Sequence, residues 1–474
     1  MLSSKWELKG KIDNGKLTCR ARFVTREFKS WDPHRDDILA AATSVSTSRL
    51  IDFKAVRCGY MVWTLDVSSA FFHVPEDELC CVRPPGEWLS RQARQDWMWL
   101  LLRLLYGRRK GPQRWVQWAG NELEKLGIMR CAAAPYFFWD PVSDVCLEAH
   151  MDDFYMTGPT KEVEAVIAKL ALVMKIKVEG PFGPGDSWSH LRRKRTWTSA
   201  GIMIMSDPRH VEKPVQLLDL GARNSKPVPV TKENLTETTA NDKELNAQEA
   251  GIYRSGVGIV LYIAPDRADI QFAVSELTRL MKTPTERGMA ILRRTIRYLA
   301  GKKGYSVMIP TATSEQENVD DDLMLYSDSN WAQDTRDRKS VSCGVIFCRG
   351  ALLQTFVRRQ TVIALSSGEA EWYAACSTVA EALHLRCLLD FGHPGSIWLY
   401  VDSTAAKGIG QRQGVGRLRH LATKTLWLQG LITEKKVKMR KVPGDENGPD
   451  IGTKAHDGPR LRYLVSLLGM KGDA

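Results

Sequence analysis

Two adjacent carboxylates, Asp152 and Asp153, lie in the stretch 147–157, between short runs that alternate apolar and polar residues. This alternation predicts a β-hairpin with the acidic pair at its tip. Neighbouring carboxylates repel each other, and a shared divalent cation is the commonest reason for them to occupy one turn. A further carboxylate, Asp66, lies near the end of the apolar run 63–67. Two such strand ends side by side could hold two Mg²⁺ ions roughly 4 Å apart, the arrangement that serves phosphoryl transfer.

A second set of carboxylates lies in the last third of the chain. Asp328 and Asp402 each follow an apolar, strand-like run. Glu371 lies in the first turns of a predicted helix, and Asp450 lies near the C-terminus. A single acid after a strand is usually a turn or cap residue. Four acids in this order instead favour a second two-metal site, one that cleaves phosphodiesters.

The predicted helix contains two glutamates, and the local pattern separates their roles. Ser366 and Glu369 match a capping box, in which Glu369 reaches back to the helix start. Glu371 lies about 200° further around the helix, on a face of small residues that we expect to pack on the sheet. This face comprises Ala374, Ala375, Thr378 and Ala382. We therefore predict Glu371 as the metal ligand.

The elements that position the first acidic pair begin at the N-terminus. Residues 5–30 are predicted as two strands around Asn14-Gly15, a strong hairpin signal. The second strand alternates Arg20 and Arg22 with small or apolar residues, so that one of its faces is cationic. This face is either a solvated edge or, beside a metal site, a surface that holds a nucleoside triphosphate.

The next elements lead to and from Asp66. Residues 43–62 are predicted to be helical and to precede the strand that carries Asp66, and a short helix is expected directly after it. Residues 101–118 are predicted to pass from an apolar strand through Tyr106-Gly107 into a Trp-rich helix. Gly107 would allow a ligand to approach the backbone closely.

The remaining chain shows an order of helices, linkers and strands. Residues 160–175 form a predicted amphipathic helix, and the Gly/Pro-rich stretch 180–187 is a turn or linker. The polar stretch 225–250 is a second linker, followed by a helical region over 251–301. The acidic stretch 311–322 is the clearest domain boundary. Beyond it we expect three strands, a long helix, a strand and further helices.

The composition and charge of the chain limit the classes of partner that it is expected to bind. The 474 residues carry a net charge of +12 with a pI of about 9.2, which favours a polyanion, and nucleic acid over a membrane. Arg293, Arg294 and Arg297 line one face of a predicted helix, which is either solvated or follows a duplex. The ten cysteines lack metal-binding spacing and indicate reduced, intracellular thiols. No apolar signal region follows Met1, and the apolar run 97–105 is too short to span a bilayer.

Together these residues resemble the polymerase and ribonuclease H region of the Pol polyprotein of copia-type LTR retrotransposons. The resemblance runs over nearly the whole chain and depends on nine motifs in order. They are RARFVTR (20–26), LDVSSAF (65–71), LYG (105–107), MDD (151–153), YRSGVG (253–258), YSDSNWA (326–332), ALSSGEAE (364–371), VDS (401–403) and DIGTK (450–454).

The resemblance implies a set of polymerase residues. Asp66, Asp152 and Asp153 would be the polymerase carboxylates, and a primer 3′-hydroxyl would attack the α-phosphorus of a dNTP. Arg20 and Arg22 would face the triphosphate. Tyr106 and Gly107 would line the nucleotide pocket.

The resemblance also implies a set of nuclease residues. Asp328, Glu371, Asp402 and Asp450 would hold two Mg²⁺ ions that activate water against the RNA strand of an RNA–DNA hybrid. His420 occupies a place where the family carries histidine. It would assist product release or contact the substrate, with a packed surface histidine as the alternative.

The sequence departs from the family at two places. His150 and Met151 precede the acidic pair, where the family has an aromatic residue and Val. The segment 108–113 lacks the usual Gln, and Lys110 shifts that site toward positive charge. Protease, integrase and capsid regions are absent, which is consistent with a fragment of a longer polyprotein or a decayed copy.

The resulting fold prediction is α/β (α+β): a right-hand polymerase, a helical connection and a ribonuclease-H-like mixed sheet. The expected domains are 1–180 (fingers and palm), 181–250 (thumb and linker), 251–322 (helical connection and acidic linker) and 323–474 (ribonuclease H-like). The expected function is an RNA-directed DNA polymerase with ribonuclease H activity.

The resemblance implies two Mg²⁺ ions per site, with Mn²⁺ as the alternative ion. The expected partners are an RNA template, a DNA primer, an RNA–DNA hybrid, dNTPs and other parts of a Pol polyprotein, with no membrane. The expected location is the cytoplasm, inside a virus-like particle if the element is complete, or the nucleus. A catalytically dead remnant that only binds nucleic acid, and a stand-alone nuclease, are the rival hypotheses.

Overall fold

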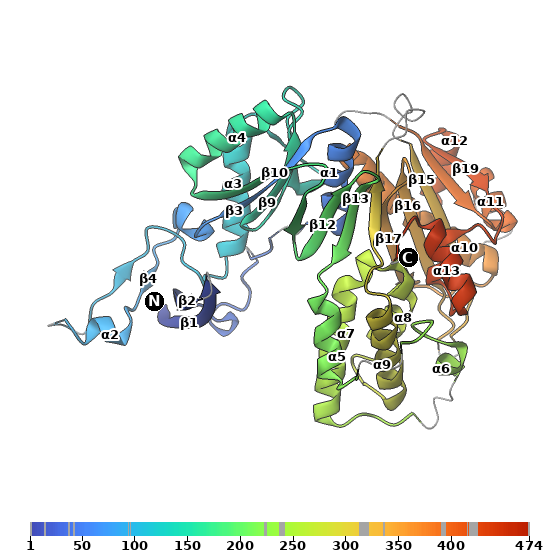
Figure 1. Ribbon diagram of the computed structural model, residues 1–474, viewed down its shortest axis with the longest axis horizontal. Helices are drawn as coiled ribbons and strands as arrows, with labels where there is room; N and C mark the ends of the chain where they lie inside the picture. Colours follow the sequence, from blue (N-terminus) through green and yellow to red (C-terminus); the bar gives the residue numbers. More distant parts are fainter. Residues whose placement is uncertain are drawn as a thin grey trace. The chain divides into compact units, whose positions relative to one another are not determined.

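The structure is a computed structural model, and it divides into two compact units. The first unit holds Met1–Ile51 and Tyr60–Pro181, and the second holds Asp52–Gly59 and Phe182–Ala474 (Figure 1). The described residues are 2–13, 16–36, 38–40, 43–92, 94, 96–221, 225–236, 242–311, 322–334, 337–389, 395–414, 416 and 425–472.

A six-stranded sheet forms the centre of the first unit, in the order β10-β3-β9-β8-β7-β6. Its strands are β3 (Met61–Val67), β6 (Met129–Cys131), β7 (Ala134–Trp139), β8 (Cys146–His150), β9 (Asp153–Gly158) and β10 (Ile176–Phe182). The helices of this unit are α1 (Val45–Cys58, shared with the second unit), α2 (Gly86–Leu89), α3 (Gly111–Lys125) and α4 (Thr160–Val173), with 3₁₀ turns η1 (Lys29–Trp31) and η2 (Ala70–His73).

Alternation along β3 explains how the sheet forms. Trp63, Leu65 and Val67 are buried at alternate positions, whereas Asp66 is exposed between them. The buried residues join one apolar cluster with the inner faces of α3 and α4. The period-two pattern therefore places the core on one side and leaves the carboxylate at the solvent side of the strand end.

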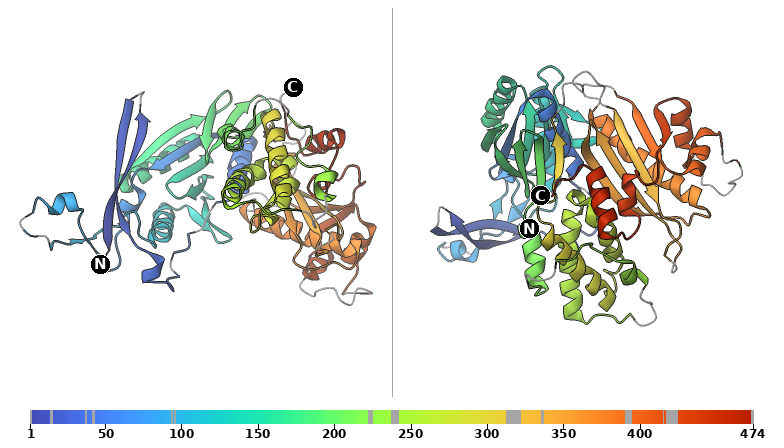
Figure 2. Two further views of the ribbon diagram at one scale, coloured as in Figure 1. Left: turned by 90° about the horizontal axis from the view of Figure 1, so that it is seen from below. Right: turned by 45° about the vertical axis from the view of Figure 1, so that its right-hand side comes forward.

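The N-terminal hairpin pairs β1 (Ser3–Asp13) with β2 (Lys16–Arg26) in antiparallel register, Asp13 opposite Lys16. The left view of Figure 2 shows it as one long dark-blue ribbon. The strands were predicted, and the Asn14-Gly15 turn itself lies outside the described residues.

The prediction of an apolar strand from residue 101 is wrong in position, because the strand lies earlier in the chain. The structure has a short strand β5 (Trp99–Leu100), paired with β4 (Cys81–Val82). Beyond it, Leu104 donates its backbone N–H to Val74, and the Arg103 guanidinium donates to the carbonyl of His73. These groups therefore bond to an irregular segment rather than to a regular ladder.

The second unit contains two sheets and a group of helices. The four-stranded sheet has the order β11-β12-β13-β14, and the five-stranded mixed sheet has the order β17-β16-β15-β18-β19. The strands are β11 (Ser187–His190), β12 (Arg193–Thr198), β13 (Gly201–Ser206), β14 (Val307–Pro310), β15 (Leu323–Ser329), β16 (Val341–Cys348), β17 (Ala351–Arg359), β18 (Ile397–Val401) and β19 (Val437–Lys441).

The helices of this unit fall into two groups along the chain. The first group is α5 (Arg209–Leu217), α6 (Lys232–Thr236), α7 (Ala247–Ile263), η4 (Ala264–Asp266), α8 (Ala268–Arg279) and α9 (Glu286–Gly301). The second is α10 (Ser367–Leu389), α11 (Thr404–Gln411), α12 (Trp427–Thr433), η7 (Gly448–Gly452) and α13 (Gly458–Leu467). Helices α5, α7, α8 and α9 pack on one another, and α8 also contacts β17 and η7 (Figure 1).

The small-residue face of α10 packs on β15 and β16, as predicted. Gly344 of β16 allows this close approach, because a Cβ atom there would lie 2.6 Å from the Thr378 hydroxyl oxygen of α10. Strand β15 pairs antiparallel with β16 and parallel with β18. The ends of β15 and β18 therefore lie side by side, next to the first turns of α10.

The α/β fold class is confirmed, and so is the helical region 251–301. Two boundaries differ from the predictions: β10 continues to Phe182, so that only 183–186 form the turn before β11, and α6 interrupts the linker 225–250. Residues 312–321 of the acidic stretch lie outside the described residues. The four-domain division stays a prediction.

Candidate active sites

The first acidic group lies where β3 and β9 meet. Asp66 is the register partner of Asp153, and directly opposed residues of antiparallel strands carry their side chains on one face. The backbone N–H of Val67 donates to the Asp152 carbonyl at 2.7 Å. The structure thus brings Asp66, Asp152 and Asp153 to one strand end, as predicted.

Crowding changes the protonation of this group. Burial, followed by the charges of Asp152 and Asp66, raises the pKa of Asp153 from its ordinary 3.8 to about 6. The hairpin tip is held in an unusual backbone conformation, since Met151 has φ = 53° and its carbonyl accepts a hydrogen bond of 2.7 Å from Trp115 Nε1. Packing from α3 therefore fixes the turn that carries the acids.

The predicted nucleotide-side residues gather beside these acids. Arg22 lies 5.2 Å above the Tyr106 ring, a cation–π distance. Burial is the largest cause and raises the pKa of the Tyr106 hydroxyl. The charges of the acidic group also raise this pKa, whereas those of Arg20 and Arg22 lower it. The cationic face of β2 and the carboxylates are consequently close enough to influence one tyrosine.

Gly107 is required, for a different reason from the one expected. It has φ = +93°, and a Cβ atom there would lie 1.9 Å from the Thr25 carbonyl oxygen. Thr25 in turn donates its backbone N–H to the Tyr106 carbonyl at 2.8 Å. The close neighbour of Gly107 is thus the protein's own strand β2.

The expected positive charge at residues 108–110 is neutralised within the first unit. The Lys110 side chain is fully buried and forms ion pairs with Glu76 and Asp77. Arg108 pairs with Glu76 at 3.0 Å and with Glu27 at 3.4 Å. The prediction that this segment makes the site more positive is therefore wrong, because carboxylates some thirty or more residues away in sequence compensate it.

The other departure, His150, also has a protein partner. Its Nδ1 atom lies 2.7 Å from the Thr43 hydroxyl. His150 is the register partner of Asp153, so this hydrogen bond anchors the hairpin directly beneath the acidic tip.

The second acidic group is more compact. Asp328, Glu371 and Asp402 each offer a carboxylate oxygen within 4.8 Å of the others, the one such group of three among the described residues. Asp328 comes from β15, Glu371 from α10 and Asp402 from the residue after β18. Asp66, Asp152 and Asp153 do not meet this distance in the described structure.

Burial dominates the electrostatics of the second group. It raises the pKa of Glu371 to about 9 and that of Asp328 to about 6, with the neighbouring carboxylates adding to both effects. Burial likewise raises the pKa of Asp402. Glu371 Oε1 accepts the Ser329 backbone N–H at 3.3 Å, while its buried Oε2 has no hydrogen-bond partner in the described structure.

The two glutamates of α10 divide their roles as predicted. Glu369 Oε2 accepts the Leu365 backbone N–H at 2.9 Å, and its own N–H donates to the Ser366 hydroxyl at 3.2 Å. Tyr373 donates to the other oxygen of Glu369. Glu369 therefore caps the helix, and Glu371 alone joins the strand-end acids.

Asp450 lies beside the compact group, in contact with cations. It forms ion pairs with Lys454 and with Arg460, the latter at 3.1 Å, and its backbone carbonyl is 2.7 Å from His456 Nε2. The position of Asp450 next to Asp328 and Asp402 was predicted; its compensation by Lys454 and Arg460 was not. The spacing of Lys454, four residues after Asp450, is the signal that could have indicated it.

Two neutral residues that the sequence did not single out position the acids. Thr453 donates its hydroxyl to Asp328 Oδ2 at 2.5 Å, and Asn447 donates to the Ser327 carbonyl at 3.1 Å. Asn447 also hydrogen-bonds Asp402. Both belong to the segment around η7, so this segment orients two strand-end carboxylates.

The compact group fits a divalent cation. Carboxylate oxygens are hard donors of the kind that Mg²⁺ and Mn²⁺ prefer, and an unpartnered buried oxygen on Glu371 is a vacant ligand position. The hairpin group supplies the same donor type in a more open arrangement. His420 lies outside the described residues, so its predicted role stays a prediction.

Comparisons with known proteins agree with this arrangement. Residues 1–232 match the family described as "Reverse transcriptase (RNA-dependent DNA polymerase)". The chain is 25% identical, over 99% of its length, to the "Retrovirus-related Pol polyprotein from transposon TNT 1-94" of Nicotiana tabacum. It is 26% identical, over 73% of its length, to the corresponding protein from transposon RE1 of Arabidopsis thaliana. It spans 36% and 23% of these relatives.

The fold is also similar to a solved structure, a foamy viral protease-reverse transcriptase in complex with RNA/DNA hybrid. The TM-score is 0.52 at 11% identity, covering 90% of this chain and 49% of that one. None of the described helices combines the length and apolarity that crossing a membrane requires.

The six-stranded sheet with its acidic hairpin, within a stretch matched by the family description, defines a reverse transcriptase domain. Over most of its length the chain is similar to the Pol polyproteins of copia-type retrotransposons, and the resemblance that its motifs predicted is confirmed.

Proposed function

We propose that the chain copies RNA into DNA and degrades the RNA strand of the resulting hybrid. The observation that carries the proposal is the meeting of Asp66 with the Asp152-Asp153 tip, next to Arg22 and Tyr106, inside the family-matched stretch. The RNA template, the DNA primer, dNTPs and the hybrid are the proposed substrates. The foamy viral relative was solved with an RNA/DNA hybrid, which supports the last of these.

Each polymerase-side residue has a task in this proposal. Asp66, Asp152 and Asp153 would hold two divalent cations beside the primer 3′-hydroxyl. Arg20 and Arg22 attract the triphosphate to the cationic face of β2. Cations bound at such carboxylates lower the pKa of the attacking oxygen and neutralise the leaving group.

On the nuclease side, the chain orients water against the scissile phosphate. Asp328, Glu371 and Asp402 supply a compact donor set, and Asp450 joins it from the segment around η7. Thr453 and Asn447 keep the strand-end acids in place. The ends of β15 and β18 and the first turns of α10 thus enclose the acidic group, with Lys454 and Arg460 adding positive charge at its edge.

The test is extension of a labelled DNA primer on poly(rA) by the purified chain, with Mg²⁺ and with EDTA, together with cleavage of a labelled hybrid. We expect both activities with Mg²⁺ and neither with EDTA. Cleavage without dNTP incorporation would favour the stand-alone nuclease. Hybrid binding without either activity would favour the remnant.

A further inference from the structure

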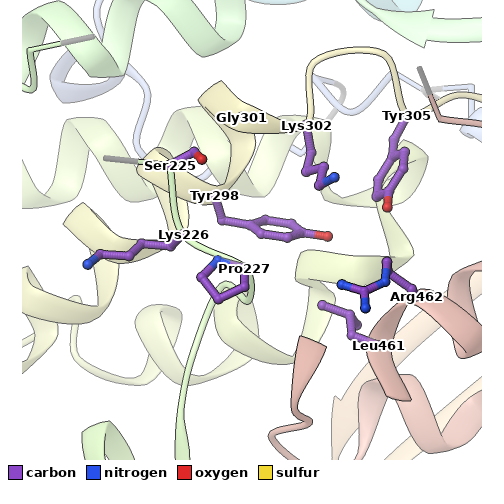
Figure 3. Close-up of a pocket in the computed structure, with 9 residues that line it drawn as sticks. All are labelled: Ser225, Lys226, Pro227, Tyr298, Gly301, Lys302, Tyr305, Leu461 and Arg462. Atoms are coloured by element: carbon purple, nitrogen blue, oxygen red, sulfur yellow. The ribbon is translucent and has the colours of Figure 1, made fainter. Parts of the chain in front are cut away.

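A cavity of about 280 Å³ lies in the second unit, and none of the carboxylates of the compact group lines it (Figure 3). Its walls come from three stretches of chain: the end of α9 with the turn after it, residues 225–227, and α13. In Figure 3, Lys302 and Tyr305 lie above the Tyr298 ring and Arg462 lies below its hydroxyl end. Gly301 allows residues 225–227 to close one side, because a Cβ atom there would lie 2.4 Å from Ser225 Cβ.

The floor of this cavity is a buried polar network whose hydrogen bonds are made. Tyr298 donates its hydroxyl to Asp269 Oδ2 at 2.7 Å, and Arg267 donates to the same oxygen at 2.6 Å. Arg267 also lies 5.3 Å from the Tyr305 ring. The floor is therefore rigid and offers a ligand aromatic surface above a buried cation.

The rim of the cavity is cationic. Among the described residues, no carboxylate pairs with Lys226, Lys302 or Arg462. This differs from Lys454 and Arg460 on the neighbouring stretch, which pair with Asp450. Lys302 and Arg462, beside the Tyr298 and Tyr305 rings, favour an anion attached to an apolar or aromatic body.

The cavity connects with the nuclease group through shared elements. Helix α13 carries Arg460, which contacts Asp450, and Arg462 two residues further on, which lines the cavity. A second cavity of about 420 Å³ lies between the following residues 228–233 and the Lys454–Arg460 stretch. The 225–233 segment thus lines both cavities, and basic side chains follow it from the nuclease group outward.

Size and shape decide the kind of ligand. A volume of 280 Å³ is just below the usual range of small-ligand sites, roughly 300–1,000 Å³. A duplex presents its phosphates on a convex surface and would reach only the rim. A flexible single strand can instead insert one nucleotide, because stacking on aromatic rings and backbone contacts with cations bind single strands without sequence preference.

We propose that this cavity binds one nucleotide of a single-stranded nucleic-acid segment that extends from the hybrid at the nuclease group. Lys302 and Arg462 contact its phosphate, and Tyr298 and Tyr305 contact its sugar or base. The proposal rests on the proposed function for the source of the strand. It adds a binding site outside both acidic groups.

The experiment measures binding to two fluorescent hybrids in EDTA, one blunt and one with a single-stranded overhang. Lys302→Gln and Arg462→Gln are each expected to weaken overhang binding about fivefold and to lower the magnitude of the salt slope by about 0.7, the value for one contact with a single strand. Blunt-hybrid binding should stay unchanged. Lys303→Gln, an exposed neighbour that does not line the cavity, is the matched control.

Two results would overturn the proposal. Equal losses on the blunt and overhang hybrids would place the cations on duplex phosphates, and unchanged binding to both would exclude the cavity from nucleic-acid contact. A titration with 5′-AMP separates a free mononucleotide from a strand: competition by AMP at micromolar concentration, without any overhang preference of the wild type, would also contradict it. Blunt-hybrid cleavage and primer extension, measured in parallel, report separately on the proposed function.

Discussion

The two acidic groups of this chain are built in opposite ways. At the hairpin, two adjacent antiparallel strands bring Asp66 and Asp153 together through one register pair, and the group is partly open. At the mixed sheet, two strands and a helix from widely separated parts of the sequence enclose Asp328, Glu371 and Asp402 within 4.8 Å. Among the described residues, only the second group brings its carboxylate oxygens close enough together to share one cation.

The difference shows in the protonation of the acids. At the hairpin, Asp153 is raised to a pKa of about 6, whereas at the mixed sheet burial raises the pKa of Glu371 to about 9. Burial, with the neighbouring carboxylates adding to it, thus favours the protonated form of Glu371 before any cation binds. We infer that the compact group binds its cations with little rearrangement, and that the open group completes its coordination with the oxygens of the nucleotide.

The largest expected effect is a clean separation of the two activities. Asp152→Asn removes a hairpin carboxylate and is expected to reduce primer extension on poly(rA) by at least about 10³-fold, roughly 4 kcal/mol in the barrier, while hybrid cleavage persists. Asp328→Asn should do the reverse. Both changes keep side-chain size, and melting curves check the fold. If either variant lost both activities together, the assignment of two separate sites would be wrong.

The next effect distinguishes the two glutamates of α10. Glu371→Gln is expected to reduce hybrid cleavage by at least about 100-fold, because it removes a ligand charge from the compact group. Glu369→Gln is the matched control on the same helix, and it should retain cleavage within a few-fold, since glutamine can also complete a capping box. Steady-state cleavage rates at saturating Mg²⁺ measure both. Equal losses would mean that the helix start, rather than the Glu371 charge, is what cleavage requires.

A smaller effect concerns the contact between Gly107 and strand β2, beside the hairpin acids. Gly107→Ala combines positive φ with a clash against the Thr25 carbonyl, at a cost of about 1–3 kcal/mol, and should displace β2 with Arg22. We expect the KM for dNTP to rise about tenfold, within the range that this cost allows, and cleavage to stay unchanged.

The control for this substitution is Gly127→Ala. Gly127 has a similar φ of +89° but nothing within 4 Å of the added Cβ, so it carries the backbone strain without the clash. Extension kinetics of the two variants separate the effects. An equal rise in KM for both would assign the effect to strain in general.

The sequence was most informative where structure is local. The acidic hairpin 146–158 and the β1–β2 hairpin follow from alternation and turn residues, and α10 follows from its cap and small-residue face. The choice of Glu371 over Glu369 depended only on helix geometry. These features need no knowledge of distant partners, which is why they could be predicted from one chain.

Long-range compensation could not be predicted. Lys110 was read as an added positive charge, but Glu76 and Asp77 neutralise it from more than thirty residues away. Gly107 was expected to let a ligand approach closely, and the contact of this glycine with the Thr25 carbonyl was not foreseen. In each case the partner belongs to an element whose neighbours are set by tertiary packing, and one-dimensional spacing carries no information about it.

The smallest expected effect tests the burial of the Glu371 carboxyl in the compact group directly. Glutamate has an ordinary pKa of 4.5, and burial raises that of Glu371 to about 9 in the folded protein. The folded state therefore favours the protonated form, and the contribution of Glu371 to stability falls as the pH rises from about 4.5 to about 9. Glutamine cannot ionise, so Glu371→Gln should raise the melting temperature of the metal-free protein at pH 8, by about 2 °C for each kcal/mol relieved.

This gain should shrink toward pH 5, where the wild-type carboxyl is protonated as well. Millimolar Mn²⁺ should stabilise the wild type at pH 8 more than the variant, because a cation that binds only the folded state gains the Glu371 carboxylate as a ligand in the wild type alone. Differential scanning fluorimetry in EDTA and in Mn²⁺ measures both differences. A variant that melts at the same temperature as the wild type at pH 8 in EDTA would mean that Glu371 relaxes into solvent, and the contrast between an open and a caged acidic group would then lose its physical basis.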